Sequence, residues 1–209
     1  MNIYNYIKVI SLSLLVLSLI KADEIEYYWS GAVTSKSAVI SFATDKKARI
    51  KIQYSESKNF KKNKRYTKAI STNEKSHYFA KEELIKLKPN QTYYYRFNIN
   101  GTLKKDQVGK FKTHSDKPFS YKVTMATCAT TGSNSPVFDR IREENSQFYL
   151  MLGDFHYGNI YRDCEDNFLT YFRSTLGSKK QSSLYNNIPI AYMLSLIHIS
   201  EPTRPRLSS

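Results

Sequence analysis

The first half of the chain alternates apolar and polar residues with the period of β-strands. From Tyr93 to Ile99 the apolar side chains take the odd-numbered positions, and Tyr94, Arg96 and Asn98 take the even ones. Such alternation is typical of an antiparallel strand with one buried and one solvated face. Shorter runs predict further strands over residues 38–42, 49–54 and 109–111. Residues 23–115 are therefore expected to form an all-β, immunoglobulin-like sandwich.

The second half of the chain changes to strands interleaved with helices. An alternating run over 120–127 is followed by a small polar loop and by a helix that starts near Pro136. The apolar run 148–152 then has the composition of a buried strand. Strand, helix and strand within so short a stretch predict a βαβ unit, whose two strands are parallel neighbours.

The segment after this unit is less regular. Residues 163–176 carry a helical apolar stripe that ends at Gly177, and residues 179–187 are interpreted as a polar loop. Residues 116–193 thus predict an incomplete α/β domain. The polar stretch 114–118, which ends in proline, is the expected boundary between the two domains.

The amino-terminal end has the pattern of a secretory signal peptide. Residues 1–22 combine a weakly basic start at Lys8, an apolar run over 9–20 and the small residue Ala22 before a plausible cleavage point. Two sequons, at Asn90 and Asn100, supply candidate glycosylation sites. We therefore expect a secreted or extracytoplasmic protein.

Basic residues outnumber acidic ones. The chain has 32 Lys and Arg against 18 Asp and Glu, for a formal net charge of +14, and a run of cations lies between Lys58 and Arg65. A solvated loop is the ordinary interpretation of this run, and attraction to an anionic surface is the alternative. No base-reading motif accompanies the charge, so we expect no nucleic-acid partner. The sequence does not indicate the oligomeric state.

The residues best suited to chemistry follow the two strands of the βαβ unit. Cys128 follows the first strand, and Asp154 and Tyr157 follow the second. Ligands of open α/β sheets bind outside the carboxyl ends of the strands. Because the carboxyl ends of neighbouring parallel strands lie at one edge, Cys128 and Asp154 are expected to converge there.

These residues carry a resemblance to a known family. Gly153, Asp154 and Tyr157 are similar to the second metal motif of the metallophosphoesterases, in the variant with tyrosine that purple acid phosphatases and alkaline phosphatase D-like (PhoD-like) enzymes share. A cysteine after the preceding strand, here Cys128, resembles the PhoD-like pattern. Residues 87–93 resemble the tyrosine corner of fibronectin type III domains, and Trp29 resembles a packing residue in the opening strand of the family's amino-terminal domain.

The resemblance implies a partial PhoD-like metallophosphoesterase domain over 116–193 that hydrolyses phosphate esters at a binuclear metal centre, with iron and calcium as the expected metals. Asp154 would be the catalytic, bridging ligand, and Cys128 and Tyr157 would be ligands of the ferric ion. No residue is assigned to an organic cofactor, and His156 has no defined role. The resemblance does not distinguish monoester from diester substrates.

Other interpretations of these residues remain open. Cys128 could be a small buried side chain, or it could form a disulfide with Cys164, which would compete with a metal role. The whole chain could also be an exported, non-enzymatic β-sandwich binding module with a degenerate α/β appendage. Further ligands after Met193 would distinguish an enzyme from this alternative.

The carboxyl-terminal end departs from the family. Residues 188–193 resemble its next core strand, which in the family leads into a motif with more metal ligands. Residues 194–204 instead resemble the conceptual translation of a sequencing adapter. We therefore expect 194–209 to be an artefactual tail, exclude His198 from the candidate ligands, and expect the chain to be an inactive amino-terminal fragment.

Amplification of the genomic locus across the codon for Met193 tests this expectation. We expect the genomic sequence to diverge from the chain after that codon. Genomic DNA that encodes residues 194–204 as printed would contradict it and would make His198 a candidate functional residue.

Overall fold

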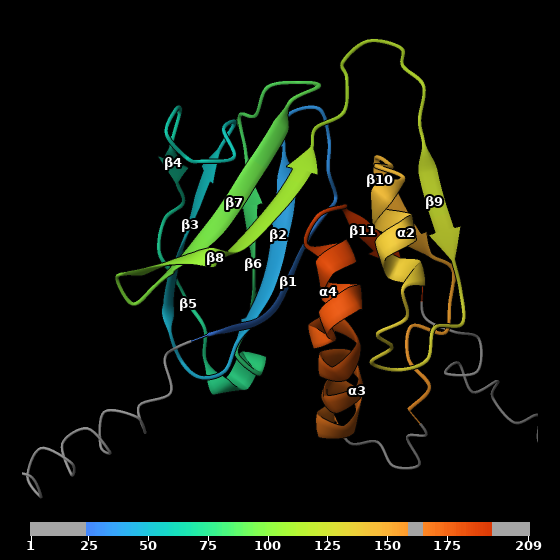
Figure 1. Ribbon diagram of the computed structural model, residues 1–209. Coiled ribbons are helices and arrows are strands. Elements are labelled where there is room, and N and C mark those ends of the chain that lie inside the picture. The colour runs from blue at the N-terminus through green and yellow to red at the C-terminus, as the bar shows by residue number, and fades with distance from the viewer. Residues whose placement is uncertain (1–23, 159–164, 194–209) are drawn as a thin grey trace, which may run out of the picture.

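The structure is a computed structural model, and it describes residues 24–158 and 165–193. Within these residues the chain forms an all-β, immunoglobulin-like sandwich followed by an α/β unit, as the sequence predicts (Figure 1). None of the helices described combines the length and apolar character that crossing a bilayer requires.

The sandwich consists of two antiparallel sheets. The first sheet has the order β1–β2–β6, with β1 at Ile25–Gly31, β2 at Ala38–Thr44 and β6 at Phe79–Leu84. The second has the order β4–β3–β7–β8, with β4 at Arg65–Tyr66, β3 at Arg49–Ser55, β7 at Thr92–Ile99 and β8 at Thr102–Lys112. Strand β5 (Ile70–Ser71) also pairs with β3, and the 3-10 turn η1 (Glu74–Ser76) precedes β6.

Strand β7 shows the alternation that the sequence predicts. Its odd-numbered side chains are buried and its even-numbered ones are half-buried. The fully buried Tyr93 also forms the expected corner, because its hydroxyl accepts hydrogen bonds from the backbone N–H of Lys88 (2.9 Å) and from Nη2 of Arg65 (3.2 Å). The Tyr93 ring stacks on Phe111 with 5.7 Å between centroids. The corner thus ties the chain before β7 to the strands that pair with it.

The α/β unit contains a parallel sheet in the order β11–β10–β9. Strand β9 spans Val123–Ala126, β10 spans Phe148–Met151 and β11 spans Ile190–Tyr192. Helix α2 (Val137–Glu143) connects β9 to β10, and these strands pair in parallel register, which confirms the predicted βαβ unit. Strand β11 lies within the segment 188–193, where the next core strand was expected.

One local prediction is wrong. Helix α3 (Glu165–Gly177) is present as expected, but residues 179–187 are not a loop, because helix α4 spans Lys179–Tyr185. Gln181, Leu184 and Tyr185 are buried on one face of α4, and the Tyr185 ring stacks on Tyr149 of β10. Packing against the sheet therefore stabilises a helix that has a largely polar sequence.

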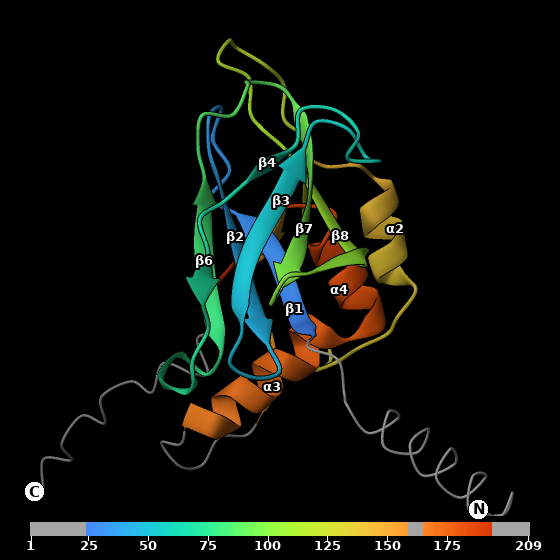
Figure 2. The same cartoon turned by 90° about the vertical axis from the view of Figure 1, so that its left-hand side faces the viewer.

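Strand β1 is buried on both faces and belongs to two cores. Tyr28 packs in the core between the sheets of the sandwich, while Tyr27 and Trp29 pack in a second core with the α/β unit. Helices α3 and α4 and strand β11 all contact β1 (Figures 1 and 2). Trp29 is 8% exposed and stacks near Phe79, so it has the packing role that was expected.

An ion pair lies at the edge of this junction. Nε of Arg173, on α3, is 3.3 Å from Oε2 of Glu26, on β1. Both side chains are partly exposed, so the pair adds little stability compared with the aromatic contacts beneath it.

The two faces of the parallel sheet differ in burial. Tyr149, Met151 and Ile190 are buried on the face that the second core covers. On the opposite face Met125 is 60% exposed and Ala191 is exposed. No described element of the chain covers that face (Figure 1).

Replacing Tyr93 with phenylalanine tests the corner. Because the variant removes the acceptor of two hydrogen bonds and keeps the ring, we expect the free energy of unfolding to fall by about 1–2 kcal/mol. The control is Tyr94→Phe, the next residue along β7 on the opposite face, for which a change below about 0.5 kcal/mol is expected. Urea denaturation of the two purified variants measures both values, and equal values would show that the corner does not stabilise the sandwich.

Candidate metal centre

Two loops that follow adjacent parallel strands form the candidate site. Leu152 N–H donates to the carbonyl oxygen of Ala126 (2.8 Å), which extends the pairing of β9 and β10 by one step. Beyond it, the backbone N–H of Cys128 (3.4 Å) and the hydroxyl of Thr127 (3.2 Å) both donate to the carbonyl oxygen of Gly153. These bonds hold the two loops side by side at the carboxyl edge of the sheet.

The three predicted side chains meet at one oxygen atom. Oδ2 of Asp154 accepts a hydrogen bond from Sγ of Cys128 (3.3 Å) and another from the hydroxyl of Tyr157 (3.0 Å). The hydrogen bond with Cys128, desolvation and the Asp154 carboxylate raise the pKa of the Tyr157 phenol above its ordinary value of 10.0. The phenol therefore keeps its proton and donates a hydrogen bond to Asp154, and a cation at this point would have to displace that proton.

Unusual backbone conformations place two of these side chains. Cys128 has φ of 60° and Asp154 has φ of 50°, in the left-handed region. Aspartate tolerates this region better than most residues, whereas cysteine has no side-chain advantage there. Residues held in such conformations are often found at functional sites, where the surrounding structure supports the strain.

Two residues that the sequence did not single out support the loop of Tyr157. Oγ1 of Thr131 accepts a hydrogen bond from the backbone N–H of Tyr157 (2.7 Å) and so joins the two loops a second time. Gly158 lies under the ring of Tyr171, where an added Cβ would be 2.1 Å from a ring carbon. The sequence predicts the polar, glycine-containing loop after β9, but no pattern in it indicates that Thr131 bonds the loop of Tyr157.

His156 packs away from the surface. It is 3% exposed, its ring lies 5.6 Å from that of Tyr171 in a stacked arrangement, and Nδ1 accepts a hydrogen bond from the N–H of Gly158 (3.2 Å). The imidazole therefore fixes the loop against helix α3.

The donor set fits a hard cation in part. Carboxylate, phenol and thiol converge on one point, and in deprotonated form all three are donors suited to a ferric ion. Cys128 is a free, exposed cysteine, and Cys164 lies outside the described residues. Among the residues that the structure describes, no group of three His, Cys, Asp or Glu side chains is close enough to hold a metal ion. The described chain thus supplies a partial shell.

The remaining candidate residues lie on the sandwich. Asn90 and Asn100 are both exposed and both have positive φ, at 52° and 49°. The cationic run from Lys58 to Arg65 lies between β3 and the end of β4, and Lys58 and Lys61 are exposed.

Comparisons with known proteins identify the sandwich. Residues 29–115 match the family described as "PhoD-like phosphatase, N-terminal domain". The solved structure of PhoD is similar, with a TM-score of 0.68 and 19% sequence identity, over 81% of this chain and 38% of that chain. The match extends past the sandwich, and this chain spans less than two fifths of the PhoD chain. At this identity the structural likeness concerns the fold.

Two weaker likenesses are confined to less than half of the chain. The sensor domain of the anti-sigma factor RsgI4 from Pseudobacteroides cellulosolvens aligns with a TM-score of 0.37 and 20% identity, over 46% of this chain and 98% of that one. A fibronectin type III domain from the human KIAA0970 protein aligns with a TM-score of 0.35 and 13% identity, over 46% and 77%. No curated protein matches the chain.

The fold is that of a β-sandwich joined to the start of an α/β domain. Residues 29–115 match the amino-terminal domain of the PhoD-like phosphatase family, and the fold of the chain is similar to that of PhoD.

The strain at Cys128 gives a test that does not depend on metal. Glycine adopts a positive φ without steric cost, so we expect Cys128→Gly to be more stable than Cys128→Ala by about 0.5–1 kcal/mol. Both variants lack the thiol, so the comparison isolates the backbone conformation. Chemical denaturation of the metal-free variants measures the difference, and an alanine variant of equal or greater stability would show that the loop is not strained.

Proposed function

We propose that this chain is the amino-terminal part of a secreted, metal-dependent phosphatase or phosphodiesterase that hydrolyses phosphate esters at a binuclear centre. The observation that carries the proposal is the convergence of Cys128 and Tyr157 on one oxygen of Asp154, in a chain with a PhoD-like fold. The family supports phosphatase chemistry, and the donor set supports a metal centre.

Asp154 has the central role in this proposal. Its carboxylate is the ligand that two cations would share, and Cys128 and Tyr157 would complete one side of an iron site, with calcium as the proposed second metal. When bound, two metal ions supply charge stabilisation for the phosphate oxygens and an activated nucleophile at mild pH. The chain's own contribution is to hold the three donors in place through the bonds between the loops and to release the protons of the thiol and the phenol.

Under this proposal the 209-residue chain has no phosphatase activity by itself. The described residues bring three protein donors to one point, and a two-metal centre needs more donors than these. A hard cation with few protein ligands keeps its waters and binds weakly. We therefore propose that the activity belongs to a longer protein that supplies the missing ligands.

Secretion and glycosylation are part of the same proposal. Residues 1–22 have the composition of a signal peptide, and the two sequon asparagines are exposed on turns of the sandwich, where a transferase can reach them. A secreted phosphatase would act on phosphate esters outside the cytoplasm.

Hydrolysis of an aryl phosphate monoester and diester tests the proposal. We expect the purified 209-residue chain to show no metal-dependent turnover, and a longer protein, obtained from a transcript that continues past Met193, to be active. In the longer protein Asp154→Asn should lower kcat by at least about a thousand-fold, because it removes the charge that both metals share. Robust turnover by the 209-residue chain, or full activity of Asp154→Asn, would contradict the assignment.

Tyr157→Phe in the longer protein supplies a spectroscopic control. If Tyr157 binds iron, the variant should keep its thermal stability and lose the visible ferric–phenolate band. Tyr121→Phe, which changes an exposed tyrosine outside the site, should keep the band. A band that survives in Tyr157→Phe would remove this residue from the ligand set.

A further inference from the structure

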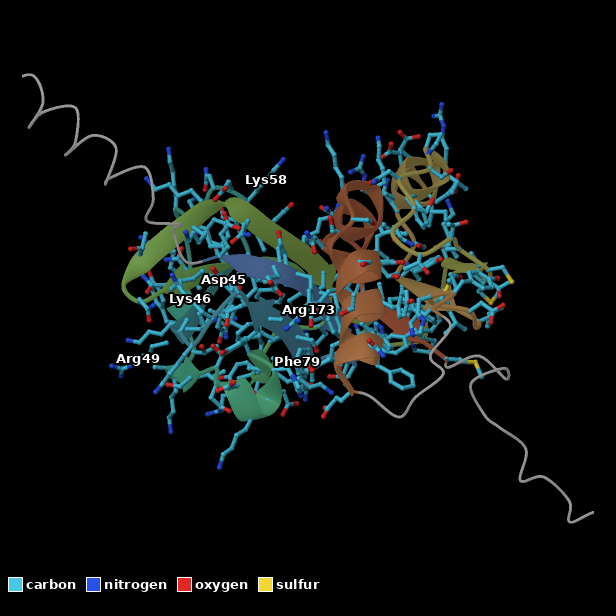
Figure 3. All side chains as sticks on the ribbon, turned by 90° about the horizontal axis from the view of Figure 1, so that it is seen from below. Asp45, Lys46, Arg49, Lys58, Phe79 and Arg173 are labelled. Atoms are coloured by element: carbon cyan, nitrogen blue, oxygen red, sulfur yellow. The ribbon has the colours of Figure 1, made fainter. Side chains whose placement is uncertain are left out.

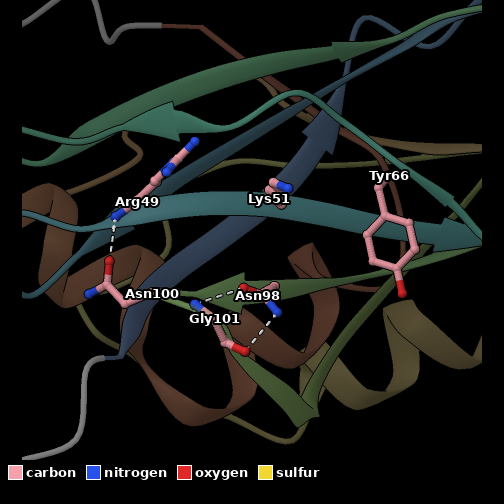
Figure 4. Close-up of a pocket in the computed structure, with 6 residues that line it drawn as sticks. All are labelled: Arg49, Lys51, Tyr66, Asn98, Asn100 and Gly101. Carbon is pink, nitrogen blue, oxygen red and sulfur yellow. Dashed lines mark hydrogen bonds between the residues drawn. The ribbon is translucent and has the colours of Figure 1, made fainter.

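A groove of about 730 Å³ lies on the outer face of the five-stranded sheet, outside the candidate metal centre (Figure 4). Its walls come from three strands and from the turn between β7 and β8. The lining residues are Arg49, Lys51, Tyr66, Asn98, Asn100 and Gly101. The volume is within the range of sites for small ligands.

Hydrogen bonds to the backbone, most of them made by the side chains of Asn98 and Asn100, make one end of the groove rigid. Asn100 and Gly101 form a two-residue hairpin turn with φ of 49° and 92°. The backbone N–H of Arg49 donates to Oδ1 of Asn100 (2.8 Å), and the N–H of Asn100 donates to the carbonyl oxygen of Arg49 (2.9 Å). Asn98 bonds both the N–H and the carbonyl of Gly101 (3.0 and 3.1 Å). The turn is thus fastened to β3 and β7, and the groove is largely pre-formed.

The groove carries an uncompensated positive charge. Arg49 and Lys51 are exposed, and no carboxylate is among the lining residues. Within the described part of the chain, neither cation forms a salt bridge. Two cations on a fixed surface without counter-charges attract an anionic ligand.

An aromatic ring stands at the other end. Tyr66 is 54% exposed, and its hydroxyl is hydrogen-bonded to Nε2 of Gln53. Oε1 of the same glutamine accepts a hydrogen bond from Nε of Arg96 (2.7 Å), and that guanidinium lies 4.0 Å from the ring centroid of Phe60. This chain of contacts holds the Tyr66 ring in one orientation while its face stays accessible.

The charges and the ring lie in a line. Arg49, Lys51 and Gln53 occupy alternate positions of β3, about 7 Å apart on one face of the strand, and Tyr66 pairs with Gln53. Cation, cation and aromatic ring therefore follow one another along the groove. The amide nitrogen of Asn98 donates one hydrogen to Gly101, and its second hydrogen can bond a hydroxyl group of a ligand.

We propose that this groove binds a linear acidic polysaccharide, whose sugar rings carry carboxylate or sulfate groups. Arg49 and Lys51 bind the acid groups, Asn98 donates to a sugar hydroxyl, and the face of a sugar ring stacks on Tyr66. Single-stranded nucleic acid fits less well, because such sites stack successive bases on several aromatic rings and Tyr66 is the one aromatic residue in the lining.

Isothermal titration calorimetry of the purified chain tests this proposal. The probes are an oligogalacturonate for the carboxylate, a heparin oligosaccharide for the sulfate, a neutral cello-oligosaccharide, and a single-stranded oligonucleotide of the same charge. The proposal concerns the form of the protein that carries no glycan on Asn100, because a glycan there would compete for the groove. The chain is therefore produced in a host that lacks N-glycosylation. We expect at least one acidic oligosaccharide to bind, more weakly at high salt, and the neutral one not to bind.

Two double variants distinguish binding in the groove from attraction by the net charge, and two variants of Tyr66 test the stacking contact. Arg49→Gln with Lys51→Gln should weaken binding about ten-fold or more, from the loss of two charge-assisted contacts. Lys58→Gln with Lys61→Gln removes the same charge from the loop after β3, and should change binding by less than about two-fold. Lys58 lies well apart from Arg49 (Figure 3). Tyr66→Ala should weaken binding about five-fold, and Tyr66→Phe by less than about two-fold.

Several results would overturn the proposal. Equal losses in the two double variants would show attraction by net charge alone. Binding of the oligonucleotide as tightly, with the same dependence on Arg49 and Lys51, would make the groove a nucleic-acid site. Failure of both acidic oligosaccharides to bind would exclude the ligand class. Circular dichroism and thermal unfolding of each variant, whose altered side chains are exposed, establish that the fold is unchanged.

Discussion

The double burial of strand β1 is the constraint on which the arrangement of this chain depends. Tyr28 fills the core of the sandwich, while Tyr27 and Trp29, its neighbours on the other face, fill the core of the α/β unit. The pairing of β1 with β2 also shifts its register between Ile25 and Tyr27. Because one short strand supplies large aromatic side chains to both cores, the sandwich and the parallel sheet are not independent bodies. The carboxyl edge of the parallel sheet, with its candidate donors, is therefore oriented by the amino-terminal domain.

The βαβ unit alone determines which loops form the candidate centre. Once β9 and β10 are parallel neighbours, the loops that carry Cys128 and Asp154 must leave the sheet at the same edge. The finer arrangement needs the left-handed backbone at both residues and the bond from Tyr157 to Thr131. In the described chain, protons occupy the contacts between thiol, phenol and carboxylate. A metal ion would exchange those two hydrogen bonds for coordination, so its affinity would depend on pH.

Sequence reasoning succeeded where a short-range pattern has only one physical solution. The alternation from Tyr93 to Ile99 and the apolar run of β10 are such patterns, and they predicted both the sandwich and the edge where the donors meet. It failed where tertiary contacts decide the outcome. The sequence predicts a loop in place of helix α4 because the buried face of that helix includes Gln181. It does not predict β6, because charged residues interrupt the apolar ones. The burial of His156 depends on helix α3, which no local pattern near His156 reveals.

The uncovered face of the parallel sheet has a consequence for the behaviour of the chain in solution. Among the described residues, Met125 and its neighbours present an apolar surface on the edge strand β9, whose outer side has no paired strand, and this favours self-association. The formal net charge of +14 opposes close approach of two copies. These two forces respond differently to ionic strength, because salt screens the repulsion and leaves the apolar attraction in place. We therefore expect the colloidal stability of this chain to decrease as salt is added.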